Sequence, residues 1–142
     1  MADCVFCDIV EGEIDAHVIF ENDGAVAFLD ANPVVDGHTV VVPKSHVERF
    51  SELPDEVTGE LFSAVKEVNR GILTGCEADG ANVGLNDGKA AGQAIPHTHV
   101  HVIPRYFDDD GGSLHSIVKA EAKEDLQVVA EKLKDEMGNF RP

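Results

Sequence analysis

The amino-acid sequence predicts an α+β fold in which an antiparallel sheet is accompanied by one long helix and one C-terminal helix. Five short runs rich in β-branched and other apolar residues, bounded by turn residues, are typical of strands. Two longer stretches repeat apolar residues every three or four positions, as amphipathic helices do. The order strand, strand, strand, helix, strand, strand, helix implies one antiparallel sheet in a single domain, residues 1–142.

Four of the strands precede the most distinctive part of the chain. Residues 17–20 and 25–29 flank four turn residues, which predicts a β-hairpin. Residues 38–43 form a nearly continuous apolar run, which predicts a central strand. Residues 81–86 predict a further strand, and a loop rich in glycine and alanine follows it.

The long helix is expected over residues 54–74, because Pro54 suits the first turn and Gly75 suits the C-cap. The second helix is expected to end at Gly138. Both show apolar residues along one face, as amphipathic helices do. The stripes consist of Val57, Leu61, Val65, Val68 and Ile72 in the first helix and of Leu126, Val129, Leu133 and Met137 in the second.

The stretch from Gly92 to Arg105 contains three of the seven histidines at alternate positions. Residues 98–103 are rich in β-branched side chains and lie between Pro96 and Pro104, which predicts the fifth strand. Because side chains alternate faces along a strand, the histidines are expected in a row about 6.6 Å apart, with valines on the core side. The row consists of His97, His99 and His101.

Three interpretations of the histidine row are open. The first is a set of half-buried histidines with satisfied hydrogen bonds, which is less expected for three in register than for one. The second is a metal site, although the outer two histidines would lie about 13 Å apart. The third is nucleophilic catalysis, because a neutral imidazole attacks phosphorus or carbonyl centres while its neighbours stabilise an anionic oxygen.

Composition narrows the classes of function. The chain carries 27 acidic and 11 basic residues, a net charge of −16, which argues strongly against nucleic-acid binding. Because the Debye length falls to about 3 Å at molar salt, such a surface is typical of a salt-adapted, halophilic-like protein. Lys89 and Arg105, the bases near the histidines in sequence, are candidates for phosphate contacts. A solvated base is the alternative for each, and the favoured one for Lys89.

The N-terminal sequence has no basic leader and no long apolar run, so we expect a cytoplasmic protein without signal peptide or membrane span. Three cysteines in this acidic chain do not suggest a disulfide framework, and Cys76 is expected to be a free, partly buried thiol. Cys4 and Cys7 form a C-x-x-C pair, which fits a zinc half-site better than a redox pair. Two unconnected thiols are the alternative.

Residues 92–105, Gly-Gln-Ala-Ile-Pro-His-Thr-His-Val-His-Val-Ile-Pro-Arg, resemble the signature of the histidine triad (HIT) family of nucleotide hydrolases and transferases. The motif most resembles that of the Hit/Hint-like branch, and the likeness extends upstream through Asn86, residues 30–43 and the two N-terminal cysteines. Thr98 departs from the apolar residue that usually separates the first two histidines. The resemblance implies a HIT-like fold and a homodimer formed through the long helix and an edge strand.

The resemblance also implies catalytic roles. His99 would be the nucleophile, and His101 would hold phosphate oxygens. His97 belongs to the triad, but binding zinc would remove it from the chemistry. His38 would support the site, with a buried structural histidine as a nearly equal alternative.

Binding roles follow from the same resemblance. Asp30 would accept hydrogen bonds from the ribose hydroxyls, and a turn acid at the end of a strand is the alternative. Asn86 and Gln93 would contact the phosphate or the leaving group. The implied ligands of a structural zinc ion are Cys4, Cys7, His46 and His97.

We therefore predict a hydrolase or transferase that acts on the α-phosphate of nucleoside phosphoramidates or dinucleoside polyphosphates. A nucleotidyl-histidine intermediate is expected, with a purine nucleotide as substrate and no catalytic metal. One alternative is a purine-nucleotide-binding module with little turnover. Another is a metal-dependent enzyme that uses the His-x-His pair as ligands.

Overall fold

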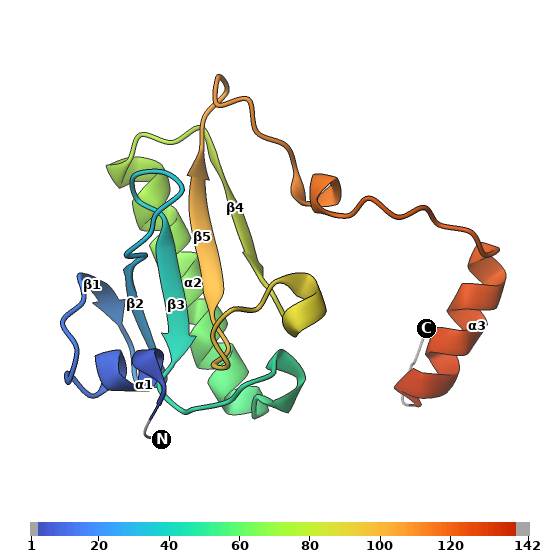
Figure 1. Cartoon of the computed structure of the whole chain (residues 1–142), viewed down its shortest axis with the longest axis horizontal. Helices are drawn as coiled ribbons and strands as arrows, with labels where there is room; N and C mark the ends of the chain where they lie inside the picture. Colours follow the sequence, from blue (N-terminus) through green and yellow to red (C-terminus); the bar gives the residue numbers. More distant parts are fainter. Residues whose placement is uncertain (1–2, 139–142) are drawn as a thin grey trace. The chain divides into compact units, whose positions relative to one another are not determined.

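The computed structural model describes residues 3–138 and has an α+β fold (Figure 1). Five strands form one antiparallel sheet in the order β1-β2-β3-β5-β4. The chain divides after Gly111 into two compact units, and the sheet lies in the first. The single domain over residues 1–142 stays a prediction. The strands are β1 (Val18–Glu21), β2 (Ala25–Leu29), β3 (Thr39–Pro43), β4 (Gly80–Leu85) and β5 (Val100–Arg105).

All five predicted strands are present, and most ends agree within one residue. The exception is β5, which begins at Val100 rather than at residue 98. The Thr98 N–H donates to the Val47 carbonyl at 2.7 Å, so a loop rather than the sheet holds this part of the chain. At its other end β5 continues through Pro104, which was expected to close it. Pairing with β3 stops at Val102, so the missing N–H of Pro104 breaks no bond to that strand.

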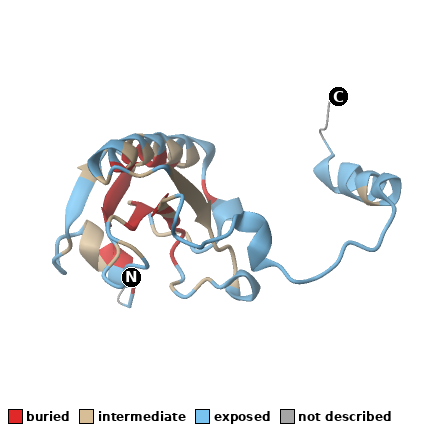
Figure 2. Cartoon of the chain, turned by 90° about the horizontal axis from the view of Figure 1, so that it is seen from above, coloured by how far each residue is buried: buried red, intermediate tan, exposed pale blue. Residues whose placement is uncertain are grey.

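The long helix α2 (Asp55–Gly75) covers one face of the sheet, as Figures 1 and 2 show. Its predicted apolar stripe is confirmed, with four members buried and Val57 partly buried. The stripe packs on buried side chains of the sheet, and removing this apolar surface from water stabilises the first unit. The buried sheet residues of this core are Ala25, Ala27, Val41, Val100 and Val102.

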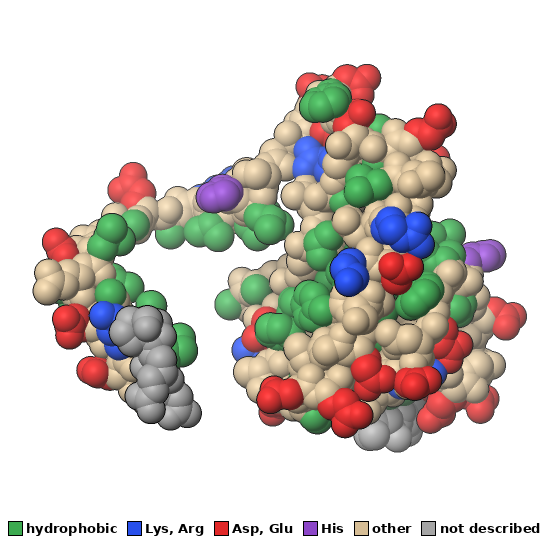
Figure 3. Space-filling model, turned by 180° about the vertical axis from the view of Figure 1, so that it is seen from behind, with side chains coloured by type: hydrophobic (Ala, Val, Ile, Leu, Met, Phe, Trp, Pro, Cys, Tyr) green, Lys and Arg blue, Asp and Glu red, His purple; other side chains and the backbone are tan. Residues whose placement is uncertain are grey.

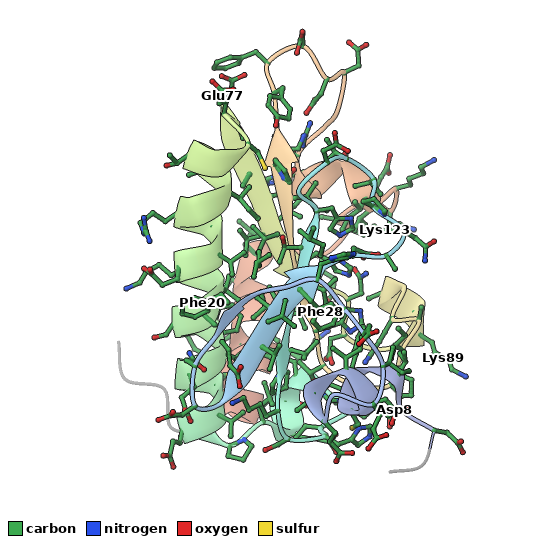
Figure 4. All side chains as sticks on the ribbon, turned by 90° about the vertical axis from the view of Figure 1, so that its left-hand side faces the viewer. Asp8, Phe20, Phe28, Glu77, Lys89 and Lys123 are labelled. Carbon is green, nitrogen blue, oxygen red and sulfur yellow. The ribbon has the colours of Figure 1, made fainter. Side chains whose placement is uncertain are left out.

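A second core on the opposite sheet face involves a helix that the sequence pattern did not predict, α1 (Val5–Val10). Six residues are too few to show a helical period. Cys4 caps this helix, since its Sγ accepts from the Cys7 N–H at 3.4 Å. Figure 4 shows Phe20 on the α2 side of the sheet and Phe28 on the α1 side. Phe28 packs against Phe6 of α1, with ring centroids 5.6 Å apart.

Three short 3₁₀ helices connect these elements. They are η1 (Phe50–Glu52), η2 (Lys89–Ala91) and η3 (Leu114–Ile117). The first two lie in the loops that lead into α2 and β5, whereas η3 belongs to the second unit.

The second unit contains the predicted C-terminal helix, α3 (Leu126–Met137). The Asp125 carboxylate accepts from the Gln127 N–H at 2.8 Å and so caps the start. Gly138 has a φ of 64°, which ends the helix where the sequence predicted. Three residues of its apolar stripe, Leu126, Leu133 and Met137, are at least half exposed.

The surface reflects the acidic composition. Figure 3 shows acidic side chains spread over one face, with few basic ones among them. Among the described residues, no helix combines the length and the apolar character that a membrane span requires.

We predict that Leu61→Ala lowers the free energy of unfolding by about 3 kcal/mol, because truncating a fully buried leucine leaves a cavity. Val34→Ala serves as a control, because Val34 is 73% exposed and its change should stay within about 0.5 kcal/mol. Urea unfolding followed by circular dichroism measures both. Equal losses in the two variants would contradict the assignment of Leu61 to the main core.

Candidate active site

The histidines gather on the sheet face opposite α2. In β5, Val100 and Val102 face the α2 core, so His101 between them faces the other side. His101 lies opposite Val40 of β3, and His38 comes just before that strand. His99 immediately precedes β5, and only 6% of its surface is exposed. Adjacent strands therefore bring together histidines that lie about sixty residues apart in sequence.

His99 has one ring nitrogen fixed and one free. Its Nδ1 lies 2.7 Å from the His97 carbonyl oxygen, and a carbonyl only accepts, so this nitrogen carries the proton. The Nε2 of a neutral ring then keeps its lone pair, which is the form that a nucleophile requires. The rings of Phe6 and His101 flank His99, with centroids 5.0 and 5.1 Å away.

His101 is fixed in the opposite sense by a chain of hydrogen bonds. The Val34 N–H donates to His38 Nδ1 at 3.2 Å, so the proton of a neutral His38 is on Nε2. That Nε2 lies 2.9 Å from His101 Nδ1, which must accept. His101 therefore carries its proton on Nε2 and can donate to an anionic oxygen. The two histidines thus offer one acceptor and one donor.

Burial favours the neutral form of His38 and His101. Desolvation lowers the pKa of His38 below its usual 6.5, although the nearby Asp30 carboxylate acts in the opposite direction. The pKa of His101 is lowered by burial first and then by His99 and His38. Neutral rings are the state that the two tautomer assignments require.

Asp30 follows β2 and faces His38. One carboxylate oxygen, Oδ2, lies 3.5 Å from His38 Nε2, while Oδ1 accepts from the Asn32 N–H at 2.8 Å. The potential ligand atoms of Asp30, His38 and His101 lie within 4.8 Å of one another. A metal ion on His38 Nε2 would move the ring proton to Nδ1, where it would meet the Val34 N–H. These residues therefore suit a hydrogen-bonded relay better than a metal site.

A second cluster unites Cys4, Cys7, His46 and His97, whose potential ligand atoms also lie within 4.8 Å of one another. The two histidine Nδ1 atoms are 3.2 Å apart. Each of these nitrogens has a cysteine Sγ at 3.3 Å, and Cys7 Sγ is also 3.6 Å from His97 Nδ1. A tetrahedral zinc ion with ordinary bond lengths would place its N···N pairs at about 3.3 Å and its S···N pairs at about 3.6 Å. The donor set and its spacing therefore fit zinc.

The hydrogen bonds around the cluster agree with this fit. His97 Nε2 lies 2.9 Å from the Pro43 carbonyl and donates to it, which leaves the Nδ1 lone pair pointing at the two sulfurs. Burial first, and then neighbouring Cys4, raise the pKa of Cys7 to about 11. The Cys7 thiol would therefore release its proton on binding a metal ion.

The loop between β4 and β5 is held from within. Gly88 and Gly92 have φ values of 89° and 96°, which favour glycine. Gln93 Oε1 accepts from the Gly88 N–H at 2.8 Å, and its Nε2 donates to the Glu48 and Ile95 carbonyls at 2.9 and 3.0 Å. Gln93 was predicted as a phosphate contact, but its polar atoms already bind the backbone. That contact stays a prediction.

Asn86, the other predicted phosphate contact, is differently placed. Its side-chain amide lies against Gly92, where an added Cβ would be 3.9 Å away. Among the described residues, no hydrogen bond to this amide is recorded, which suits a group that awaits a ligand. The next residue, Asp87, instead forms a bidentate pair with Arg49 at 3.0 and 3.3 Å.

The two candidate bases lie in different places. Arg105, at the far end of β5 from His99, binds Asp109 at 2.7 and 2.9 Å and also contacts Asn82. Arg105 lies four positions along the strand from His101, about 13 Å away in an extended chain, so it does not belong to the histidine site. Lys89 is exposed on η2, and Figure 4 shows its side chain pointing outward.

Some residues of the site were missed by sequence reasoning. Val34 and Pro43 act through backbone atoms, which leave no residue-type signal. Phe6, whose ring packs edge-on against His97 and His99, was also missed. Its position between the two cysteines was the available signal, although Val5, which also lies between them, is exposed. Cys76 is a free, partly buried thiol, as expected.

Comparison with protein-family models matches residues 11–108 to the HIT domain. The chain belongs to the HIT family. The resemblance inferred from the His-x-His-x-His segment is therefore confirmed, as is the fold class.

Individual relatives add detail. An uncharacterized HIT-like protein of Methanocaldococcus jannaschii is 46% identical over 106 residues, covering 75% of this chain and 81% of the relative. An adenosine 5′-monophosphoramidase of Candida albicans is 30% identical over 140 residues, covering 96% and 92%. The crystal structure of a Zn-bound histidine triad family protein from Mycobacterium smegmatis superposes with a TM-score of 0.73, at 32% identity and with 96% and 94% coverage.

We predict that the free energy of unfolding falls as the pH is lowered from about 6.5. Burial depresses the pKa of His38 and His101 in the folded state, so the unfolded chain binds protons first. The contribution is fully present above the unfolded pKa and is lost as the pH falls through the folded values. In His38→Asn the slope between pH 7 and about 5 should be shallower. Urea titrations at constant salt and metal content measure it; an unchanged slope contradicts the prediction.

Proposed function

We propose that this protein is a nucleotidyl hydrolase or transferase that acts on the α-phosphorus of nucleoside phosphoramidates or dinucleoside polyphosphates. The observation that carries the proposal is the opposite polarity of two adjacent histidines. His99 donates a hydrogen bond from Nδ1 to the His97 carbonyl and has a lone pair on Nε2, whereas His101 has its proton on Nε2. A relative with monophosphoramidase activity supports the same class of reaction.

The chemistry proceeds in two displacements. His99 Nε2 forms a bond to the α-phosphorus, and the bond from phosphorus to the amide nitrogen or bridging oxygen breaks. The leaving group departs with that electron pair and takes up a proton from solvent. A water oxygen, or an acceptor hydroxyl, then attacks phosphorus and loses its proton to solvent, and the electron pair of the P–N bond returns to His99. The Nε2 proton of His101 stabilises the phosphoryl oxygens during both steps.

Substrate contacts belong to the same proposal. The Asp30 carboxylate, which keeps one oxygen near His38, is suited to accept from ribose hydroxyls. The Asn86 amide and the glycine-rich loop are suited to the phosphate. His38 orients His101, and Gln93 holds the loop in shape. Ala94 offers no hydroxyl to a departing group, so good leaving groups should react best.

We also propose that the Cys4–Cys7–His46–His97 cluster holds a structural zinc ion. The donor spacing fits a tetrahedral ion, and a solved relative contains zinc. Bound there, the ion supplies a cross-link between the N-terminus, the loop after β3 and the start of β5. Elemental analysis should find about one equivalent per chain, and its absence from natively purified protein would argue against this assignment.

A homodimer is the expected assembly. Among the described strands, β4 pairs only with β5, so its outer edge offers free backbone groups for a second copy. Antiparallel pairing of two such edges would extend the sheet about a two-fold axis. Sedimentation equilibrium distinguishes this dimer from a monomer.

We predict that His99→Ala abolishes AMP release from adenosine 5′-phosphoramidate and from a diadenosine polyphosphate, because the attacking nitrogen is lost. Loss of the nucleophile should lower kcat by at least about 10³-fold. His115→Ala is the matched control, since His115 is an exposed histidine of the second unit and should keep full activity. Chromatographic assay of AMP at molar salt measures both.

The alternatives give different results in this assay. Turnover that survives in His99→Ala would remove the covalent mechanism. Nucleotide binding without turnover in the wild type would instead favour the nucleotide-binding module. A metal-dependent enzyme would be favoured by two results together: a chelator abolishes the activity of protein that stays folded, and His99→Ala is still active when the metal is present.

We predict that both substrate affinity and stability rise with salt. The net charge of −16 repels an anionic nucleotide and also the chain itself, and both effects are screened as the Debye length shortens. The KM for a diadenosine polyphosphate should fall, and the urea midpoint should increase, between about 0.15 M and 1 M KCl. Adenosine is the matched uncharged ligand, whose binding should change least. A stability optimum near physiological salt would contradict salt adaptation.

A further inference from the structure

We propose that the Cys4–Cys7–His46–His97 cluster, once it holds a metal ion, sets the alignment of the catalytic groups, which makes Cys4, Cys7 and His46 positioning residues for turnover. This inference rests on the proposed function and goes beyond a structural staple. Three separate connections lead from the cluster into the histidine site. Each is made by named contacts of the described residues.

The first connection runs through His97 itself. Its ring is held on both edges, with Nδ1 facing the cysteine sulfurs and Nε2 donating to the Pro43 carbonyl at 2.9 Å. The carbonyl of the same residue accepts the Nδ1 proton of His99 at 2.7 Å. A metal ion on the ring therefore restrains the peptide group that fixes the tautomer of the nucleophile. In the sequence, only Thr98 lies between the proposed ligand His97 and the proposed nucleophile His99.

The second connection begins at His46 and leads to the phosphate loop. Each of the next three residues forms a hydrogen bond with the segment between β4 and β5. The Val47 carbonyl accepts from the Thr98 N–H at 2.7 Å, and the Glu48 carbonyl accepts from Gln93 at 2.9 Å. Arg49 donates two hydrogen bonds to the carboxylate of Asp87, the neighbour of Asn86. Anchoring His46 therefore also anchors the loop that precedes the triad.

The third connection is Phe6, which lies between the two cysteines. Its ring centroid is 5.0 Å from that of His99, so it helps to set the position of the nucleophile's ring. Among the described residues, the recorded backbone hydrogen bonds of residues 4–14 stay within that segment. Side chains alone, including both cysteines, thus hold α1 and Phe6 against the sheet. Losing the metal would loosen this attachment most.

These connections predict an effect on turnover rather than on affinity. The His97 carbonyl, the loop and Phe6 all act on groups that meet the reacting phosphorus, whereas Asp30, the proposed ribose contact, lies just after β2 and outside the cluster. Weakening one hydrogen bond of the nucleophile is worth roughly tenfold in rate. Metal removal should therefore lower kcat while leaving KM nearly unchanged.

The test uses the full chain with ¹⁵N-labelled histidine rings, either loaded with one equivalent of zinc or freed of metal by a chelator. NMR shifts of the ring nitrogens report the tautomer of His99, and adenosine 5′-phosphoramidate turnover gives kcat and KM. We expect zinc-loaded protein to show a single Nδ1–H tautomer. Metal-free protein should show a mixture of tautomers and a kcat about tenfold lower, with KM within about threefold, and added zinc should restore both.

Matched variants separate the connections. Cys7→Ala leaves three ligands, so its spectrum and rate should shift from those of the zinc-loaded protein toward those of the metal-free protein. Cys7→His keeps four ligands and should match the zinc-loaded protein. Cys76→Ser removes the thiol outside the cluster and should change neither readout. Arg49→Ala cuts the connection to the loop, so it should lower kcat without altering the His99 tautomer.

Two results would overturn the inference: folded metal-free protein with the His99 tautomer and kcat of the zinc-loaded form, or folded Cys7→Ala with both unchanged. If metal-free wild type loses its fold, Cys7→Ala, which can hold zinc through three ligands and a water, decides the question. If zinc-loaded protein turns over no substrate, the proposed function fails, and the tautomer comparison still decides whether the cluster controls His99.

Discussion

The hydrogen bond from His99 Nδ1 to the His97 carbonyl is the constraint on which the site depends. It leaves Nε2 of His99 as an acceptor, which the proposed nucleophile requires, and the residues before His99 lie outside the sheet. Thr98 therefore bonds to Val47 in a neighbouring loop, and β5 begins two residues later than the β-branched pattern indicates. The His97 ring, turned away from the row, then lies fully buried among Cys4, Cys7 and His46.

Backbone groups at both ends of the relay set the direction of every proton. The chain from Val34 through His38 to His101 starts at an N–H, which can only donate, whereas His99 ends at a carbonyl, which can only accept. These fixed backbone ends give two adjacent imidazoles opposite polarity. Burial lowers the pKa of His38 and His101, which preserves that arrangement at neutral pH.

The sequence predicted the five strands, the long helix and the histidines because these depend on repeating patterns and on side-chain chemistry. It did not predict α1, since six residues show no period. It also placed His97 in one row with His99 and His101, whereas the His97 ring lies with Cys4, Cys7 and His46, before β5 begins. Gln93 was interpreted from its neighbours in the motif, yet its amide is bound by two backbone groups of its own loop and by the Glu48 carbonyl of the loop after β3. Contacts made by backbone atoms across the fold leave no trace in residue type.

The strong negative charge is compatible with an anionic substrate because the site relies on dipoles. Arg49 and Arg105 are each bound by a carboxylate, Asp87 and Asp109, and so contribute little net positive charge. The groups suited to phosphate are instead a neutral His101 N–H, the Asn86 amide and the loop backbone, which act only at short range. Salt screens the long-range repulsion between the acidic surface and the substrate, whereas it hardly weakens the short-range hydrogen bonds to the phosphate. An acidic surface and a phosphoryl-transfer site can therefore coexist in one small protein at high salt.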